Sequence, residues 1–353
     1  MEIQKEFTKN QLSQPIVRMT VFNNPDVVAE GWYFVMRSKE LKTGKVHSFS
    51  IGHQDLVIWR TESGKLGCVD AYCPHMGTHL GKGTVKKENI QCFFHHWKYD
   101  SEGQCKDIPA DPSFCKSVKT KSYAVAEHFE SIWVFPKSTS PTPLTCFPEL
   151  VGQDLEVSFG TSYQRRCHHH VTMINGIDPQ HLKTVHNIDI EMEVDARATD
   201  RQMQISLAGA IGNANWIARM TQFFIGPFYS YSMLYDHAST GFLTLVKDSH
   251  WFGGKNKIPS LYMIFAYRPL AGGQSSVQPI FLTRKRSGWM GKITSKILIA
   301  ITRMGFKSLQ GEDGEVYENM RFAPNKLLPI DRPVGQYIQY VNKIPTSQWG
   351  KSQ

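Results

Sequence analysis

The pattern of hydrophobic and polar positions divides the chain into two parts. Between residues 31 and 136, short runs rich in Val, Ile, Phe, Trp and Tyr alternate with turns that contain Gly, Ser and Lys. Runs of this kind bounded by turn residues predict β-strands, and we expect strands at 31–38, 47–52, 54–61, 66–72, 91–100 and 131–136. The first part is therefore predicted to be a small antiparallel β domain, with limits at 28–137.

A linker is predicted at 137–150, which is rich in Ser, Thr and Pro and has no periodic apolar signal. After it, residues 175–186 can form a helix and residues 288–321 are compatible with a late helix. Between these two segments we expect strands at 202–211, 229–237, 241–248, 260–268 and 277–286. A sheet followed by a helix indicates an α+β domain, for which we expect limits at 151–345.

The late helix carries a regular apolar pattern. Its apolar residues at helical spacing are Met290, Ile293, Ile297, Ile301 and Met304. Basic residues lie elsewhere around the helix, at positions 292, 296, 303 and 307. We expect this helix to pack on the sheet, and peripheral contact with a membrane surface is the alternative.

Composition limits the class of protein. A chain of 353 residues with 41% hydrophobic residues suits a folded protein of about two domains. No apolar run approaches the length needed to span a bilayer, and residues 1–12 lack the apolar region of a signal peptide. We therefore expect a cytoplasmic location, where seven cysteines are better used for metal ligation than for a disulfide framework.

The formal net charge of +9 admits nucleic acid, an anionic membrane or an acidic protein as a partner. The basic residues are scattered, and no nucleic-acid-binding motif accompanies them. We expect an acidic protein partner and no nucleic acid.

Two mixed cysteine and histidine pairs form the first candidate metal site. Cys73-Pro-His75 is followed, after residues 76–91, by Cys92-Phe-Phe-His95. A two-iron two-sulfur cluster of the Rieske type needs two Cys on one iron and two His on the other. A zinc site accepts the same four ligands, but zinc fingers usually present two cysteines together and two histidines together. The mixed pairs favour the iron-sulfur cluster, and His79 and His96 are better interpreted as neighbouring histidines that are not ligands.

A second candidate site begins at Asn175 and contains Asp178, His181 and His186. Residues five apart on an ideal helix point about 140° away from each other. Both histidines therefore reach one metal only if the helix is kinked or locally widened. Two histidines and one carboxylate form the usual ligand set of a mononuclear iron(II) that activates O2.

The block CPHMGTHLGKG...QCFFHHWKYD resembles the cluster-binding motif of Rieske oxygenases, usually C-P-H-R-G and C-x-x-H-G-W. By this resemblance, Cys73 and Cys92 hold one iron of the cluster, and His75 and His95 hold the other. Two positions depart from the common form: residue 76 is Met where Arg is frequent, and residue 96 is His where Gly is frequent.

The segment from Asn175 to His186 resembles the N-x-x-D-x-x-H-x4-H signature of the same family, which implies that His181 and His186 bind iron(II). The carboxylate ligand is implied in the late helix, where residues 310–318 resemble the family's acidic segment. Asp313 matches best, Glu312 is the second candidate and Glu315 the third. A solvated helix face is the ordinary meaning of such a charge cluster.

The resemblance also implies a role for Asp178, which in related oxygenases connects the two metal centres across a subunit interface. Asp178 precedes His181 by three residues, so its carboxylate can reach the imidazole on a helix. The alternative is an Asp that caps the helix beginning at Pro179.

The fold implied by the resemblance is an N-terminal antiparallel β Rieske domain joined to a C-terminal helix-grip (START-like) catalytic domain, assembled as a homotrimer. In its length, the chain resembles the single-subunit ketosteroid hydroxylases, cholesterol 7-desaturases and O-demethylases. The implied activity is hydroxylation of an organic, apolar or polycyclic substrate with O2, using electrons that come from NAD(P)H through a ferredoxin or a ferredoxin reductase. The aromatic stretch 221–237 is compatible with a pocket for such a substrate, although aromatic residues are more often sheet core.

Four other functions remain open. Oxidative demethylation and desaturation begin with a similar hydrogen abstraction. A Rieske electron-transfer protein would need only the first motif, and a zinc-stapled binding protein would need neither iron site. The set of His181, His186 and Asp313 distinguishes an oxygenase from an electron carrier.

Overall fold

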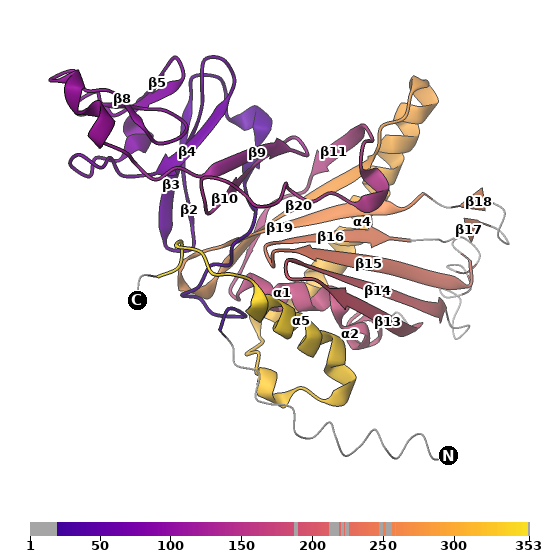
Figure 1. The fold of residues 1–353 in the computed structure, drawn as a ribbon. Coiled ribbons are helices and arrows are strands. Elements are labelled where there is room, and N and C mark those ends of the chain that lie inside the picture. Colours follow the sequence, from indigo (N-terminus) through magenta and orange to yellow (C-terminus); the bar gives the residue numbers. More distant parts are fainter. Residues whose placement is uncertain are drawn as a thin grey trace.

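The structure is a computed structural model that describes residues 20–186, 190–211, 219, 222, 226–246, 250–251, 256–257 and 259–351. Strands β1–β10 form an N-terminal half, and the elements from β11 to α5 form a C-terminal half (Figure 1). Most strands pair antiparallel with their neighbours, and the helices are few, so the predicted α+β class is confirmed. No helix in the described part of the chain is long and apolar enough to cross a membrane.

The N-terminal half consists of three small antiparallel sheets. The first has the order β1 (Tyr33–Arg37), β10 (Ser131–Phe135), β9 (Ala124–His128), and the second has the order β2 (Val46–Ile51), β3 (Gln54–Arg60), β4 (Leu66–Asp70). The third has the order β5 (Thr84–Lys86), β6 (Asn89–Gln91), β7 (Lys98–Tyr99), β8 (Cys105–Asp107). Alternating side chains from the first two sheets, among them Tyr33, Leu56 and Ile58, form one buried core.

One predicted strand, at 91–100, is wrong. Residues 92–97 instead form a loop between β6 and β7, because the Cys92 N–H donates to the Trp97 carbonyl at 2.9 Å and His96 takes a positive φ of 60°. A tight turn of this kind interrupts the ladder although the residues themselves have high strand propensity.

The C-terminal half is built on an eight-stranded antiparallel sheet. Its order is β11 (Leu155–Phe159), β20 (Ser275–Arg284), β19 (Leu261–Pro269), β16 (Thr240–Leu245), β15 (Phe228–Asp236), β14 (Gln202–Ile211), β13 (Ile190–Ala198), and β12 (Tyr163–Arg165) also pairs with β20. The helices are α1 (His169–Ile174), α2 (Pro179–Thr184), α4 (Gly288–Glu318) and α5 (Arg332–Lys343). A separate hairpin joins β17 (His250–Trp251) to β18 (Asn256–Lys257). Short 3₁₀ turns lie at Ser38–Glu40, Leu80–Lys82, Pro112–Ser117, Pro148–Leu150, Asn175–Ile177, Ala271–Gly273, Pro324–Lys326 and Pro329–Asp331.

The large sheet is covered on both faces. One face packs against α1, α2, α4 and α5, and Met233, Tyr235 and Tyr267 belong to this core. Phe242 and Ile264 project to the other face, where they pack with Trp133 of β10. Because strand side chains alternate between faces, a single sheet supports both the helical layer and the N-terminal half. Of the aromatic stretch 221–237, residues 221 and 223–225 lie outside the described residues, while Tyr231 and Tyr235 are core.

The predicted contact between the late helix and the sheet is confirmed, but the face that makes it differs from the prediction. Helix α4 packs through Ser295, Ile299 and Thr302, which are buried, and Ile299 lies in an apolar cluster with residues of β19 and β20. Ser295 Oγ donates to the Arg284 carbonyl at 3.2 Å, and its small side chain allows a close approach. The expected packing residues form an exposed stripe instead, here called the α4 stripe: Met290, Ile293, Ile297, Ile301 and Met304.

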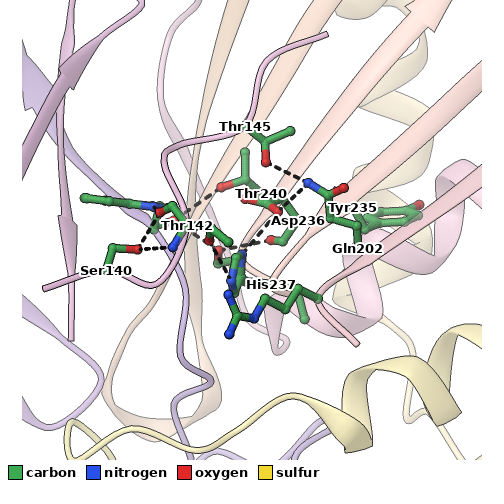
Figure 2. Close-up of polar contacts among 12 residues, drawn as sticks. Ser140, Thr142, Thr145, Gln202, Tyr235, Asp236, His237 and Thr240 are labelled. Carbon is green, nitrogen blue, oxygen red and sulfur yellow. Dashed lines mark hydrogen bonds and ion pairs between the residues drawn. The ribbon is translucent and has the colours of Figure 1, made fainter. Parts of the chain in front are cut away.

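Polar contacts connect the linker to the turn between β15 and β16 (Figure 2). Gln202 Nε2 donates to Thr145 Oγ1 at 2.8 Å and to Asp236 Oδ1 at 3.1 Å. Thr142 Oγ1 lies 3.5 Å from His237 Nε2. The predicted linker segment is thus attached to the large sheet at two points.

The two ends of the described chain exchange places: the start packs into the C-terminal half, and the end packs into the N-terminal half. Val21 and Phe22 are buried in the core of the C-terminal half, whereas Trp349 is buried in the core of the N-terminal half. Backbone contacts support the exchange, because the Ser347 N–H donates to the Val28 carbonyl and the His53 N–H donates to the Trp349 carbonyl. These segments hold the halves together from both sides.

Candidate metal centres

The four residues of the first motif lie on two loops with matching turns. In one loop the Cys73 N–H donates to the Thr78 carbonyl, and in the other the Cys92 N–H donates to the Trp97 carbonyl, both at 2.9 Å. Gly77 has φ 70° and His96 has φ 60°, so each loop turns back through a left-handed residue after its histidine. Glycine adopts this conformation without strain and histidine does not, which explains why glycine is the usual residue at position 96.

The thiols lie inside and the imidazoles outside. Cys73 and Cys92 are buried, and Cys73 Sγ lies 3.2 Å from the Tyr99 hydroxyl. Burial raises the pKa of the Cys73 thiol, so a bound cation would have to stabilise its thiolate form. The rings of His75 and His95 face each other with centroids 4.7 Å apart, and His75 is exposed.

The distances between the four side chains of the first motif help to distinguish an iron-sulfur cluster from a zinc ion. All seven cysteines are free, so these thiols are available as ligands. A single tetrahedral zinc would place its ligand atoms within about 4 Å of one another. Within the described ranges, only two groups of three or more possible ligands have atoms within 4.8 Å of one another, and neither includes these four residues. Two pairs that do not converge on one point fit a two-iron cluster better than one zinc ion.

The second candidate site is assembled by α2 and α4. The ligand atoms of His181, His186 and Asp313 lie within 4.8 Å of one another. His186 Nε2 is 3.0 Å from Asp313 Oδ1, and the two histidine rings are 5.2 Å apart. Asp313 Oδ1 is buried and has no hydrogen-bond partner among the described residues, as expected of an oxygen that faces a cation.

The predicted distortion of the histidine helix is present. Helix α2 follows a break at Asp178-Pro179 and ends at Thr184. Beyond its end the His186 N–H approaches the His181 carbonyl at 3.4 Å, a spacing of five residues that widens the last turn. This widening brings His186 to the same side as His181.

Each histidine of the site is oriented through its second nitrogen. His181 Nδ1 contacts the Asp178 backbone carbonyl, and His186 Nδ1 lies 2.6 Å from Glu312 Oε2. These partners leave the Nε2 lone pair of each ring free, as in metal-bound histidines whose other N–H is held by a carbonyl or carboxylate. Burial lowers the pKa of His181, which favours the neutral form that ligates a metal.

Within one chain, the Asp178 carboxylate does not make the predicted contact with the His181 imidazole. Its Oδ1 accepts from the Gln180 N–H at 2.9 Å and caps α2, the alternative that the Asp-Pro pair indicated. Within one chain, the contact with His181 is made by the Asp178 carbonyl instead of its carboxylate. The helix start decides this, since Pro179 has no N–H and the cap must serve Gln180.

Arg165 positions α4 beside this site, although it belongs to no motif of the sequence. Its guanidinium donates to the Gln310 carbonyl at 3.1 Å, and its Nη1 lies 3.9 Å from Glu318 Oε1. A Cβ at Gly314 would lie 2.8 Å from Arg165 Nη1, so a side chain next to Asp313 would displace this guanidinium.

A cluster of three histidines was also missed, although the run His168-His169-His170 was a visible signal. All three are buried, and their ring centroids are 4.2–4.4 Å apart. The Nδ1 atoms of His168 and His170 accept backbone N–H groups at 3.3 and 3.2 Å, so the neutral rings carry their proton on Nε2. A metal would need those Nε2 lone pairs, and the cluster is therefore better described as a set of buried neutral imidazoles.

The comparisons with known proteins agree with this geometry. Residues 31–126 match the family described as the Rieske [2Fe-2S] domain. A structure of dicamba monooxygenase bound to 3,6-dichlorosalicylic acid has a TM-score of 0.66 with this chain, at 18% identity, covering 89% of this chain and 96% of that one. An oxygenase and ferredoxin complex of carbazole 1,9a-dioxygenase has a TM-score of 0.66 at 17% identity, covering 93% and 94%. Residues 31–126 are therefore similar to the Rieske [2Fe-2S] domain, and the chain shares its overall fold with these two structures.

Curated relatives are more similar in sequence. Cholesterol 7-desaturase of Bombyx mori is 33% identical over 177 residues, which are 49% of this chain and 39% of that protein. The oxygenase component of a 3-ketosteroid-9-alpha-monooxygenase of Rhodococcus rhodochrous is 30% identical over 169 residues, 46% of this chain and 45% of that protein. The matches thus span less than half the length of either relative.

Proposed function

We propose that this chain is the oxygenase component of a Rieske non-haem iron enzyme, which uses O2 and electrons from a partner protein to hydroxylate an organic substrate. The observation that carries the proposal is the approach of His181, His186 and Asp313 to one point, in a chain that also has a Rieske domain. A Rieske electron carrier would need only the first of these features.

The cluster ligands in this proposal are Cys73 and Cys92 on one iron and His75 and His95 on the other. The buried thiols and outer imidazoles support it, because the histidine side of the cluster then faces the surface where electrons enter. Trp97 stacks on His75 with ring centroids 4.1 Å apart and holds that imidazole in place.

The catalytic iron ligands in this proposal are His181, His186 and Asp313. Glu312 orients His186 from the opposite ring nitrogen, and the Asp178 carbonyl does the same for His181. Iron(II) held by these three residues would supply the site at which O2 is activated, and O2 together with the partner's electrons would provide the oxidant. The residues of this chain hold the ligands in place, and burial favours the neutral form of the His181 imidazole.

The names of the relatives favour an apolar, polycyclic substrate, since they include a cholesterol desaturase and a ketosteroid monooxygenase. Desaturation or oxidative demethylation at the same site is the alternative outcome. We further propose a cytoplasmic location, because seven free cysteines suit a reducing compartment.

The proposed electron donor is a ferredoxin or ferredoxin reductase, which receives electrons from NAD(P)H. We also propose a homotrimer in which the His95 side of one chain approaches the His181 side of the next through Asp178. Two observations support this. The sheet β5–β8, which carries the His95 loop, and helix α2 lie at opposite ends of the molecule (Figure 1), and Asp178 still has a second carboxylate oxygen beyond its cap.

The test is product formation by the iron-loaded protein with a surrogate ferredoxin and reductase, supplied with a panel of sterols, ketosteroids and aromatic acids. We expect an oxidised sterol or ketosteroid, and no product from the His181→Ala variant, which should keep the visible bands of the cluster. If the unmodified protein contains a Rieske cluster but no second iron, the electron-carrier function replaces this proposal.

A further inference from the structure

An exposed apolar surface runs along the first half of α4. The five residues of the α4 stripe are 46–71% exposed, and Trp289 beside them is 73% exposed. In Figure 1 the first turns of α4 project beyond the edge of the large sheet. Contiguous exposed apolar surface of this kind marks a contact site instead of ordinary surface variation.

The stripe lies on the side of α4 that is turned away from the protein. At about 100° per residue, its members fall on the face opposite Ser295, Ile299 and Thr302, which hold the helix to the sheet. In the described part of the chain, the stripe therefore stays exposed while the helix is packed on the sheet.

The charged residues that accompany the stripe along the chain are all basic. Residues 284–311 contain seven Lys or Arg residues and no Asp or Glu. Lys292, Lys296 and Lys307 are exposed and form no ion pair with any described residue. An exposed apolar stripe flanked by cations, with a Trp near one end, is the composition of a helix that lies in the interface of an anionic bilayer.

We propose that α4 docks on an anionic lipid surface, with the α4 stripe among the headgroups and Lys292, Lys296 and Lys307 on lipid phosphates and carboxylates. Charge decides against a symmetric contact in which the α4 stripes of two copies meet, because it would bring the seven basic residues of each helix region together. Anionic lipid offers the opposite charge along the whole length of the stripe.

The position of α4 also links this surface to the proposed iron site, a step that rests on the proposed function. Ile301 and Asp313 are on the same helix, about 18 Å apart at 1.5 Å per residue. A docked helix therefore holds Asp313 near the bilayer, which suits a substrate that partitions into lipid.

The experiment is co-sedimentation of the full, iron-loaded chain with vesicles of phosphatidylcholine alone or of phosphatidylcholine mixed equally with phosphatidylglycerol. We expect binding to the anionic vesicles that weakens as salt is raised. Ile293→Ser with Ile297→Ser should weaken that binding about tenfold or more, since both side chains lose their burial in lipid. Lys292→Glu with Lys296→Glu should remove the preference for anionic vesicles.

The matched control is Leu328→Ser with Ile330→Ser, two residues of similar exposure that lie outside α4. It should bind as the unmodified chain does. Equal vesicle binding by the two double serine variants would overturn the proposal. So would the absence of any vesicle binding by the unmodified chain. A change in sedimentation mass without lipid in the Ile293→Ser, Ile297→Ser variant would assign the stripe to contacts between copies. None of these measurements uses O2, electrons or substrate, so their failure leaves the oxygenase proposal unaffected.

Discussion

His186 Nε2 lies 3.0 Å from Asp313 Oδ1, although His186 follows the end of α2 and Asp313 lies near the end of α4. The other nitrogen of the same imidazole lies 2.6 Å from Glu312 Oε2. The two adjacent acids therefore occupy opposite edges of one ring. Their separate positions suggest different roles, with Asp313 as ligand and Glu312 as the group that orients His186.

Asp313→Ala should abolish mononuclear iron binding and product formation while the Rieske bands remain. Glu312→Gln should keep the iron but lower its affinity about 10- to 100-fold, the usual cost of losing an orienting partner. Iron per chain, measured by metal analysis during titration with iron(II), separates the two variants. Loss of iron in Glu312→Gln together with its retention in Asp313→Ala would reverse the assignment.

Cys92→Ser and His95→Ala should each remove the visible bands and the low-temperature EPR signal of the cluster. The second iron should stay bound, because its proposed ligands lie in α2, just after α2 and in α4. Tyr99→Phe serves as a control that removes only the hydroxyl near Cys73, and it should retain the signal. A normal Rieske signal from Cys92→Ser would exclude that cysteine as a ligand.

His96→Gly should raise the free energy of unfolding by up to about 1 kcal/mol, because it relieves a left-handed conformation that disfavours side chains. Gly77→Ala should lower it by a similar amount, since φ is 70° there and no other atom lies within 4 Å of the added Cβ. Urea unfolding with the cluster intact measures both. A loss of stability in His96→Gly would show that the His96 side chain makes a contact worth more than the strain.

The buried histidine cluster should make the protein sensitive to acid. Burial lowers the pKa of His168 to about 4 and the pKa values of His169 and His170 well below their usual range. Below about pH 6.5 the unfolded chain binds protons at these rings while the folded chain does not, so stability falls as pH falls. For His168 alone the loss is about 2 kcal/mol at pH 5 relative to pH 8.

The measurement is urea unfolding at several pH values between these limits, compared with His168→Gln. Between pH 8 and pH 5, the free energy of unfolding of the variant should fall by about 2 kcal/mol less than that of the unmodified protein, which is the contribution of the His168 imidazole. Identical pH dependence in the two proteins would mean that His168 is protonated in the folded state.

Asp178→Asn should preserve the cap of α2, because Asn is as good an N-cap as Asp. Both metal sites should therefore load, whereas reoxidation of the cluster by O2 and substrate should become much slower if the charge connects neighbouring chains. Single-turnover kinetics of the pre-reduced variant measure this. Reoxidation at the unmodified rate would leave Asp178 with only its capping role.

Mixing inactive His95→Ala and His181→Ala chains provides an independent test of the same arrangement. Reassembled mixtures should regain partial activity, because one chain supplies an intact cluster and its neighbour an intact iron site. No recovery in mixed oligomers would contradict electron transfer between chains.

The sequence by itself determined the local features of this protein. Strand β14 occupies the residues predicted for it, because its alternating apolar pattern matches the period of a strand. The Cys92 and His95 segment was predicted as a strand and is a loop. The need for a widened turn between His181 and His186 could likewise be read from their separation of five residues.

Only the tertiary structure decided the contacts between distant segments. Asp313 and Glu312 are adjacent in sequence and chemically alike, and the packing of α4 against Arg165 and α2 determines which of them meets His186 Nε2. The same packing turned the α4 stripe away from the sheet, because the hydrogen bond from Ser295 and the burial of Ile299 outweigh the periodic apolar pattern. A pattern along one helix shows that it has an apolar face, but the sum of contacts over the whole fold decides what that face meets.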